Sequence, residues 1–168
     1  MRGRWLVNLI LLLLVVVLGA AAQRELERPE RGPILTDLDP GTISAVVIER
    51  LGAARIRLQR TSEGWRLLEP LEAAADGERV ARLLRIAAAP VRRVLPSDAE
   101  PQALGLEPPR LTLTLDGLEL RIGDTEPLAQ RRYVAVGDRV SLIDDRHYHH
   151  LIAPAQAYAG GAAVEDGE

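Results

Sequence analysis

Residues 111–123 read LTLTLDGLELRIG, and this stretch predicts a β-hairpin. Apolar and polar residues alternate on both sides of Asp116-Gly117, which is typical of two strands that each bury one face. Asp-Gly is a dipeptide that the two-residue type I′ turn prefers, because both turn residues adopt a positive φ. The alternation places the apolar residues of each strand on a common face: Leu111, Leu113 and Leu115 in the first strand, and Leu118, Leu120 and Ile122 in the second.

The segments on both sides of this hairpin carry similar strand signals. After it, residues 133–136 and 140–143 predict two strands that turn at Gly137-Asp138. Before it, three further short strands are predicted, at residues 43–49, 55–60 and 65–68. The short turns between neighbouring strands indicate a largely antiparallel sheet.

One main amphipathic helix is predicted between the two groups of strands. Asp76 is a suitable N-cap, and Pro90 is a suitable end. A weaker helix is predicted over residues 146–158, with an interruption at Pro154. Strands followed by a helix and then by more strands indicate the α+β class. The apolar residues of the main helix recur at helical spacing: Val80, Leu83, Leu84, Ala87 and Ala88.

A long apolar run lies near the N-terminus. Residues 5–22 read WLVNLILLLLVVVLGAAA, without a charged residue, and predict a transmembrane helix. Arg2 and Arg4 precede this run without a neighbouring acidic residue, so we expect the N-terminus in the cytoplasm and the rest in the periplasm. The alternative is a signal peptide that is cleaved after Ala22, which would also export the domain.

These signals divide the chain into four parts. We expect a cytoplasmic tip with a transmembrane anchor over residues 1–22, and a solvated stalk rich in charge and proline over residues 23–42. The periplasmic α+β domain is expected over residues 43–158, and a disordered acidic tail over residues 159–168.

The composition excludes several kinds of chemistry. The chain has no cysteine, so disulfides, thiolate nucleophiles and cysteine-zinc sites are excluded. All 21 basic residues are arginines, so lysine Schiff bases and the P-loop lysine are excluded as well. The net charge of −3 argues against a nucleic-acid-binding surface.

Three groups of residues were weighed as candidate sites. A dense acidic and histidine cluster could hold a divalent metal, although it lacks the HExxH pattern. Ser141 could form a triad with a nearby histidine and Asp144, although it lacks the glycine spacing of a nucleophile elbow. An arginine ridge could bind anionic headgroups or an acidic partner, although a solvated helix face is the more usual meaning of such a run. The cluster consists of Asp144, Asp145, His147, His149 and His150, and the ridge of Arg79, Arg82, Arg85, Arg92 and Arg93. From these signals we predict no catalytic, cofactor-binding or metal-binding residue.

Several short segments, in this order, resemble a bacterial family known as domain of unknown function family four-three-four-zero. They are GWRLLEP at residues 64–70, GLEPP at residues 105–109, LRIG at residues 120–123 and RYV at residues 132–134. The chain has Leu104 where the family pattern has an aromatic residue before Gly-Leu. The resemblance implies an accessory envelope protein linked to ABC-type transport systems of the gliding-motility type. It carries no known active site, so we assign only structural roles: Trp65 in the core, and Gly105 and Gly123 at turns.

The sequence therefore predicts a single-pass inner-membrane protein whose periplasmic domain is not an enzyme. Its expected partners are the lipid bilayer and a membrane or periplasmic protein, without a cofactor. Two alternatives stay open: a metal-assisted periplasmic hydrolase that uses the cluster at residues 144–150, and a released periplasmic binding module.

Overall fold

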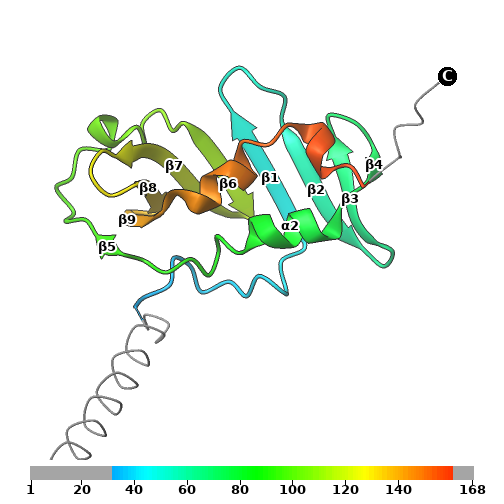
Figure 1. Ribbon diagram of the computed structural model, residues 1–168, viewed down its shortest axis with the longest axis horizontal. Coiled ribbons are helices and arrows are strands. Elements are labelled where there is room, and N and C mark those ends of the chain that lie inside the picture. Colours follow the sequence, from blue (N-terminus) through cyan, green and yellow to red (C-terminus); the bar gives the residue numbers. More distant parts are fainter. Residues whose placement is uncertain (1–31, 161–168) are drawn as a thin grey trace, which may run out of the picture. The chain divides into compact units, whose positions relative to one another are not determined.

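The computed structural model describes residues 32–160, and the strands of this part form one nine-stranded sheet (Figure 1). All neighbouring strands are antiparallel, in the order β4-β3-β2-β1-β6-β7-β8-β9-β5. The predicted class, a mostly antiparallel sheet with few helices, is confirmed. The strands are β1 (Ala45–Arg50), β2 (Ile56–Thr61), β3 (Gly64–Glu69), β4 (Ala73–Ala74), β5 (Arg93–Val94), β6 (Leu111–Leu115), β7 (Leu118–Glu126), β8 (Arg131–Val136) and β9 (Arg139–Asp144).

The sheet consists of two meanders that meet in the middle. Strands β1 to β4 follow one another along the chain and across the sheet, and so do β6 to β9. The two meanders join through β1 and β6, which pair from Val46↔Leu115 to Arg50↔Leu111. This central pairing makes one continuous surface out of two local ones.

The predicted hairpin is confirmed as β6 and β7. Its turn residues, Asp116 and Gly117, have φ angles of 45° and 91°, as a type I′ turn requires. The Asp116 carboxylate also accepts hydrogen bonds from the backbone amides of Ser44 at 3.1 Å and Ala45 at 2.7 Å. Burial raises the pKa of Asp116, but these bonds and one from the Ser44 hydroxyl outweigh it and lower the pKa below its ordinary value. The turn therefore also holds the start of β1 in place.

The main core lies on one face of this sheet. The register aligns Ile56, Ile48, Leu113 and Leu120 across β2, β1, β6 and β7, and each is at most 1% exposed. Helix α2 (Gly77–Leu84) covers this face with Val80, Leu83 and Leu84 (Figure 1). Trp65 is partly buried against the same core, as predicted, and the Arg60 guanidinium lies 5.1 Å from its ring centroid.

The helix begins as predicted but ends earlier. The Asp76 carboxylate accepts a hydrogen bond from the Arg79 amide at 3.1 Å and caps the helix. The helix ends at Leu84 instead of continuing to Pro90, and i→i+3 bonds turn the chain over residues 83–89. In a continued α-helix Ala89 would point to the side opposite Val80, whereas the tighter turns bury Ile86, Ala87 and Ala89 together. Ala88, which was predicted on the buried stripe, is exposed.

The opposite face of the sheet is covered at one end. Ala135 and Leu142 point to this face by register, and both are buried outside the main core. Leu106 is also buried outside the main core, in the connection that follows the 3-10 helix η1 (Gln102–Leu104). This connection packs on β7 so closely that a Cβ at Gly123 would lie 2.3 Å from the Leu104 carbonyl oxygen.

The domain extends beyond the predicted limits at both ends. Residues 33–42 were expected in a solvated stalk, but Leu35 is fully buried and its amide donates to the Ala89 carbonyl at 2.9 Å. Burial of this leucine offsets the ordering of the segment. At the other end, the Gly160 amide donates to the Ala74 carbonyl at 2.7 Å, beside β4.

The remaining boundary predictions lie outside the described residues. These are the anchor at residues 5–22, the first part of the stalk at residues 23–31 and the tail at residues 161–168. Within residues 32–160, no helix is long and apolar enough to cross a membrane.

We predict that Leu113→Ala lowers the free energy of unfolding by about 3 kcal/mol, because it leaves a cavity at the centre of the core. Leu113 is fully buried, whereas Leu51 is 94% exposed in the turn between β1 and β2. Leu51→Ala is therefore the matched control and should leave stability nearly unchanged. Urea unfolding of both variants measures the difference, and equal losses would contradict this assignment of the core.

Candidate ligand-binding site

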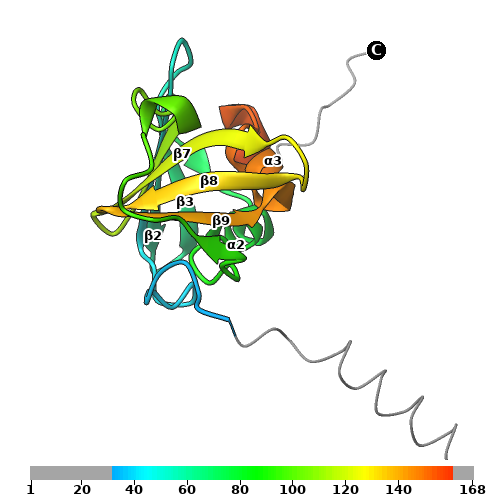
Figure 2. The same ribbon diagram turned by 90° about the vertical axis from the view of Figure 1, so that its left-hand side faces the viewer.

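The C-terminal segment of the domain carries the histidines across the sheet. It follows β9 as three short pieces: the 3-10 helix η2 (Asp145–His147), helix α3 (Tyr148–Leu151) and the 3-10 helix η3 (Ala155–Tyr158). The weak helix predicted over residues 146–158 is thus divided, with the predicted break before Pro154. Figure 2 shows α2 and α3 on the same side of the strands.

Two side chains fasten this segment to the core. Arg50 donates to the carbonyls of Ile152 at 2.6 Å and Ala153 at 3.3 Å, near the C-terminal end of α3. Tyr158 is fully buried, and its hydroxyl donates to the His150 carbonyl. Burial raises the pKa of Tyr158 to about 12, although Arg50 and Arg79 act in the opposite direction.

Both carboxylates of the candidate metal cluster, Asp144 and Asp145, are bound by arginines. Arg92 donates to the two oxygens of Asp144 at 3.1 and 3.0 Å. This bidentate bond is the main reason that the pKa of Asp144 lies below its ordinary value, against the effect of burial. Arg132 donates to Asp145 at 2.5 Å. Both acidic groups therefore take part in the structure of the domain.

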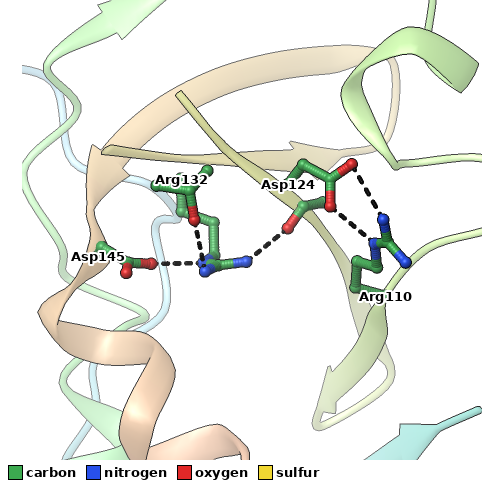
Figure 3. A network of polar contacts seen from close by, with 6 residues as sticks. Arg110, Asp124, Arg132 and Asp145 are labelled. Atoms are coloured by element: carbon green, nitrogen blue, oxygen red, sulfur yellow. Dashed lines mark hydrogen bonds and ion pairs between the residues drawn. The ribbon is translucent and has the colours of Figure 1, made fainter. Parts of the chain in front are cut away.

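Arg132 is the centre of a buried polar network (Figure 3). Besides Asp145, its guanidinium donates to the Gly123 carbonyl at 2.8 Å and the Thr125 hydroxyl at 2.7 Å. It also lies 3.5 Å from the ring centroid of Tyr148. The Arg132 guanidinium thus connects β7, β8, η2 and α3, and each of its three nitrogen atoms donates a hydrogen bond.

The three histidines lie beside two arginines of the α2 region, in an open pocket of about 560 Å³. We call it the Arg–His pocket. Six of its ten lining residues are basic: Arg82, Arg85, Arg146, His147, His149 and His150. The others are Pro40, Ala88, Ala89 and Pro90, so no carboxylate from residues 32–160 lines it.

The positive groups of this pocket repel one another. Burial lowers the pKa of His150, and so do His149, Arg82, Arg79 and Arg85. Burial likewise lowers the pKa of His147, together with Arg146 and His150 and against the effect of Asp144. The Nε2 atom of His147 is buried without a hydrogen-bond partner within residues 32–160. A pocket lined by arginine and histidine side chains attracts an anion.

The structure also shows how the residues of the candidate metal cluster and of the candidate serine triad lie. Within residues 32–160, no three His, Asp or Glu side chains lie together as a metal-binding group. Ser141 is fully buried on the core face of β9, where its Oγ atom has no hydrogen-bond partner in this part of the chain. Since Asp144 is held by Arg92, the residues weighed for a serine triad do not form one.

The predicted arginine ridge is divided between different tasks. Arg82 and Arg85 line the Arg–His pocket, whereas Arg92 binds Asp144 and Arg93 binds Glu126 at 3.0 Å. The sequence contained both halves of the pocket as separate candidates, but no local signal connected residues 82–85 with residues 146–150. Their proximity results from the packing of α2 beside α3.

The fold and the pocket together define a small antiparallel α+β domain with a pocket lined mainly by basic residues. Residues 65–157 match the family described as Domain of unknown function (DUF4340). The match covers more than half of the 168 residues, so the chain belongs to this family, as the short segments above indicated. A search of curated proteins and a search of solved structures gave no match.

We predict that Arg132→Met lowers the free energy of unfolding by about 3 to 5 kcal/mol, because it leaves Asp145 without its buried partner. The matched control is Arg110→Met. Arg110 binds Asp124 at 2.7 Å, but its side chain is 62% exposed, against 10% for Arg132. The control should therefore lose much less stability in the same thermal unfolding experiment. A larger loss of stability for Arg110→Met than for Arg132→Met would contradict the assignment of Arg132 as the centre of the buried polar network.

We predict that Tyr158 ionises late in the folded protein, with a pKa of about 12. Its neutral form is favoured by folding, so its contribution to stability is present below pH 10 and is lost as the pH rises towards 12. Phenolate absorbance measured against pH should contain this late component in the native protein and lack it in Tyr158→Phe. Its persistence in the variant would assign it to another tyrosine.

Proposed function

We propose that this chain is a single-pass inner-membrane protein whose periplasmic domain acts without catalysis, as an accessory or scaffold component of an ABC-type transport or envelope complex. The observation that carries the proposal is the uncharged run at residues 5–22, followed closely by a folded domain. A run of this length and composition is suited to spanning a bilayer.

The start of the folded domain makes the connection to the proposed anchor short. Leu35 is already part of the core, and the Pro33 carbonyl accepts a hydrogen bond from the Val91 amide at 2.8 Å. Only residues 23–32 remain between the anchor and the domain, and ten residues reach at most roughly 35 Å. The domain would therefore work in the layer next to the membrane, where membrane-embedded partners are accessible.

The polar groups of the domain support a binding role. Asp144 and Asp145, the carboxylates that a hydrolase would use for a metal, are occupied by Arg92 and Arg132. A group of basic side chains instead lines the Arg–His pocket, where arginine and histidine can hold an anionic group. The link to ABC-type transport is implied by the family resemblance.

We predict that crosslinking in native membranes captures at least one membrane-embedded partner. Replacing residues 1–22 by a cleavable signal peptide should export the same domain but reduce partner recovery by about tenfold or more, because the anchor raises the local concentration. The comparison is made by identifying the crosslinked proteins for the two forms at equal expression.

Two further measurements complete this experiment. N-terminal sequencing of the mature protein decides between the anchored form and one released after Ala22. A reporter fused after Glu168 should be active in the periplasm. Activity only in the cytoplasm, or a monodisperse protein without partners after mild detergent extraction, would contradict the proposal.

A further inference from the structure

We propose that the Arg–His pocket is a binding site for a phosphate monoester. The phosphate group would lie among the guanidinium and imidazole groups of Arg82, Arg85 and His150. The organic part would lie against the apolar lining residues Pro40, Ala88, Ala89 and Pro90. This inference goes beyond the proposed membrane role and does not depend on the topology of the chain.

The arginines of this pocket are paired less closely than four structural arginines of the domain. Arg92, Arg110, Arg121 and Arg132 lie 2.5 to 3.0 Å from their carboxylate partners. In the pocket, Arg82 lies 3.9 Å from Glu78, and Arg146 lies 3.9 Å from Asp144. These distances are too long for a hydrogen bond, so their guanidinium groups keep donors for a ligand.

Arg85 is the clearest case among them. Its side chain makes no hydrogen bond and no ion pair within residues 32–160, although its residue lines the pocket. It follows α2 directly as the C-cap residue, and its neighbours Leu84 and Ile86 are buried in the core. The backbone that positions Arg85 is therefore held by packing, while its charged end is available.

The histidines supply further donors at the same place. His149 and His150 both line the pocket, and neither has a side-chain hydrogen bond in the described part of the chain, whereas His147 Nε2 is enclosed by protein atoms. A neutral imidazole donates one hydrogen bond, and a protonated one donates two. A ligand with several acceptor oxygens would satisfy these groups.

The size and charge of the pocket favour a phosphate monoester over a single carboxylate. A monoester carries a charge of about −1.5 to −2 and three acceptor oxygens, which suits a site with several guanidinium groups. The pocket of about 560 Å³ is also in the range of small-molecule sites. Its apolar residues provide a surface for an organic substituent, which inorganic phosphate would leave uncovered.

Binding should strengthen as the pH falls from about 7.5 to 6. The groups that face the two histidines are Arg79, Arg82 and Arg85 from the α2 region, Asp144 from β9, and Arg146 and His149 from the C-terminal segment. The net effect of burial and these charges lowers the pKa of His147 and of His150 in the free protein. An anion between them favours their protonated forms, so proton uptake accompanies binding.

The test uses the full chain in phosphatidylcholine nanodiscs, with phenyl phosphate as the probe in isothermal titration calorimetry. We expect saturable binding that weakens at least about tenfold in the double variant Arg82→Gln/Arg85→Gln, because two charge-assisted contacts are lost. His150→Gln should weaken binding and reduce the pH dependence. Arg55→Gln is the matched control. Arg55 lies directly before β2, is half-exposed and pairs with Glu49 at 3.3 Å.

The outcomes separate the proposal from its rivals. Absence of phenyl phosphate binding, equal binding of benzoate, or an equal loss in Arg55→Gln would overturn it, provided that thermal unfolding shows each variant to be folded. Stronger binding of a glutamate-rich peptide would also overturn it in favour of an acidic protein partner. If phosphatidic acid in the nanodisc weakens probe binding, the natural source of the phosphate is a lipid headgroup; if it has no effect, the source is a free ester.

Discussion

The pairing of β1 with β6 is the interaction on which the rest of this structure depends. Each meander alone would have an open edge with unpaired backbone groups and only half of the apolar surface. Joined, they align Ile48 with Leu113 at the centre of a nine-stranded sheet. Asp116 reinforces this junction, because the same residue forms the turn after β6 and accepts hydrogen bonds at the start of β1. The covering elements then have a continuous surface on which to pack.

The pocket is a consequence of how that surface is covered. Helix α2 and the C-terminal segment both lie over the main core, one from the middle of the chain and the other from its end (Figures 1 and 2). Arg50 and Tyr158 fix the second of these by its backbone carbonyls, and Arg132 fixes its beginning through Asp145. The side chains of Arg82, Arg85 and the histidines, which take no part in these contacts, come together where α2 and the C-terminal segment meet. Structural arginines are thus paired, while those at the pocket keep their donors.

Much of the fold could be predicted from the sequence because its signals are local. The Asp116-Gly117 turn, the alternation in β6 and β7, and the Asp76 cap each depend on residues that are close in the chain. The predicted end of α2 was wrong. The chain leaves the α-helix after Leu84 because this buries Ile86 and Ala89, which outweighs continuing the helical spacing that would bury Ala88. The stalk was predicted too long because the dense charge and proline of this segment obscured the two buried residues Leu35 and Thr36.

The sequence by itself determined seven of the nine strands, the cap of the main helix, the exclusion of cysteine and lysine chemistry, and the family. These follow from residue types, turn dihedral preferences and short spacings, which need no knowledge of distant partners. Only the tertiary structure decided that Asp144 and Asp145 serve arginines, that Ser141 is buried, and that Arg85 lies in one pocket with His147. The reason is that these proximities join residues from 13 positions apart, for Arg132 and Asp145, to about sixty, for Arg85 and His147, and the packing of the chain on one sheet sets their positions.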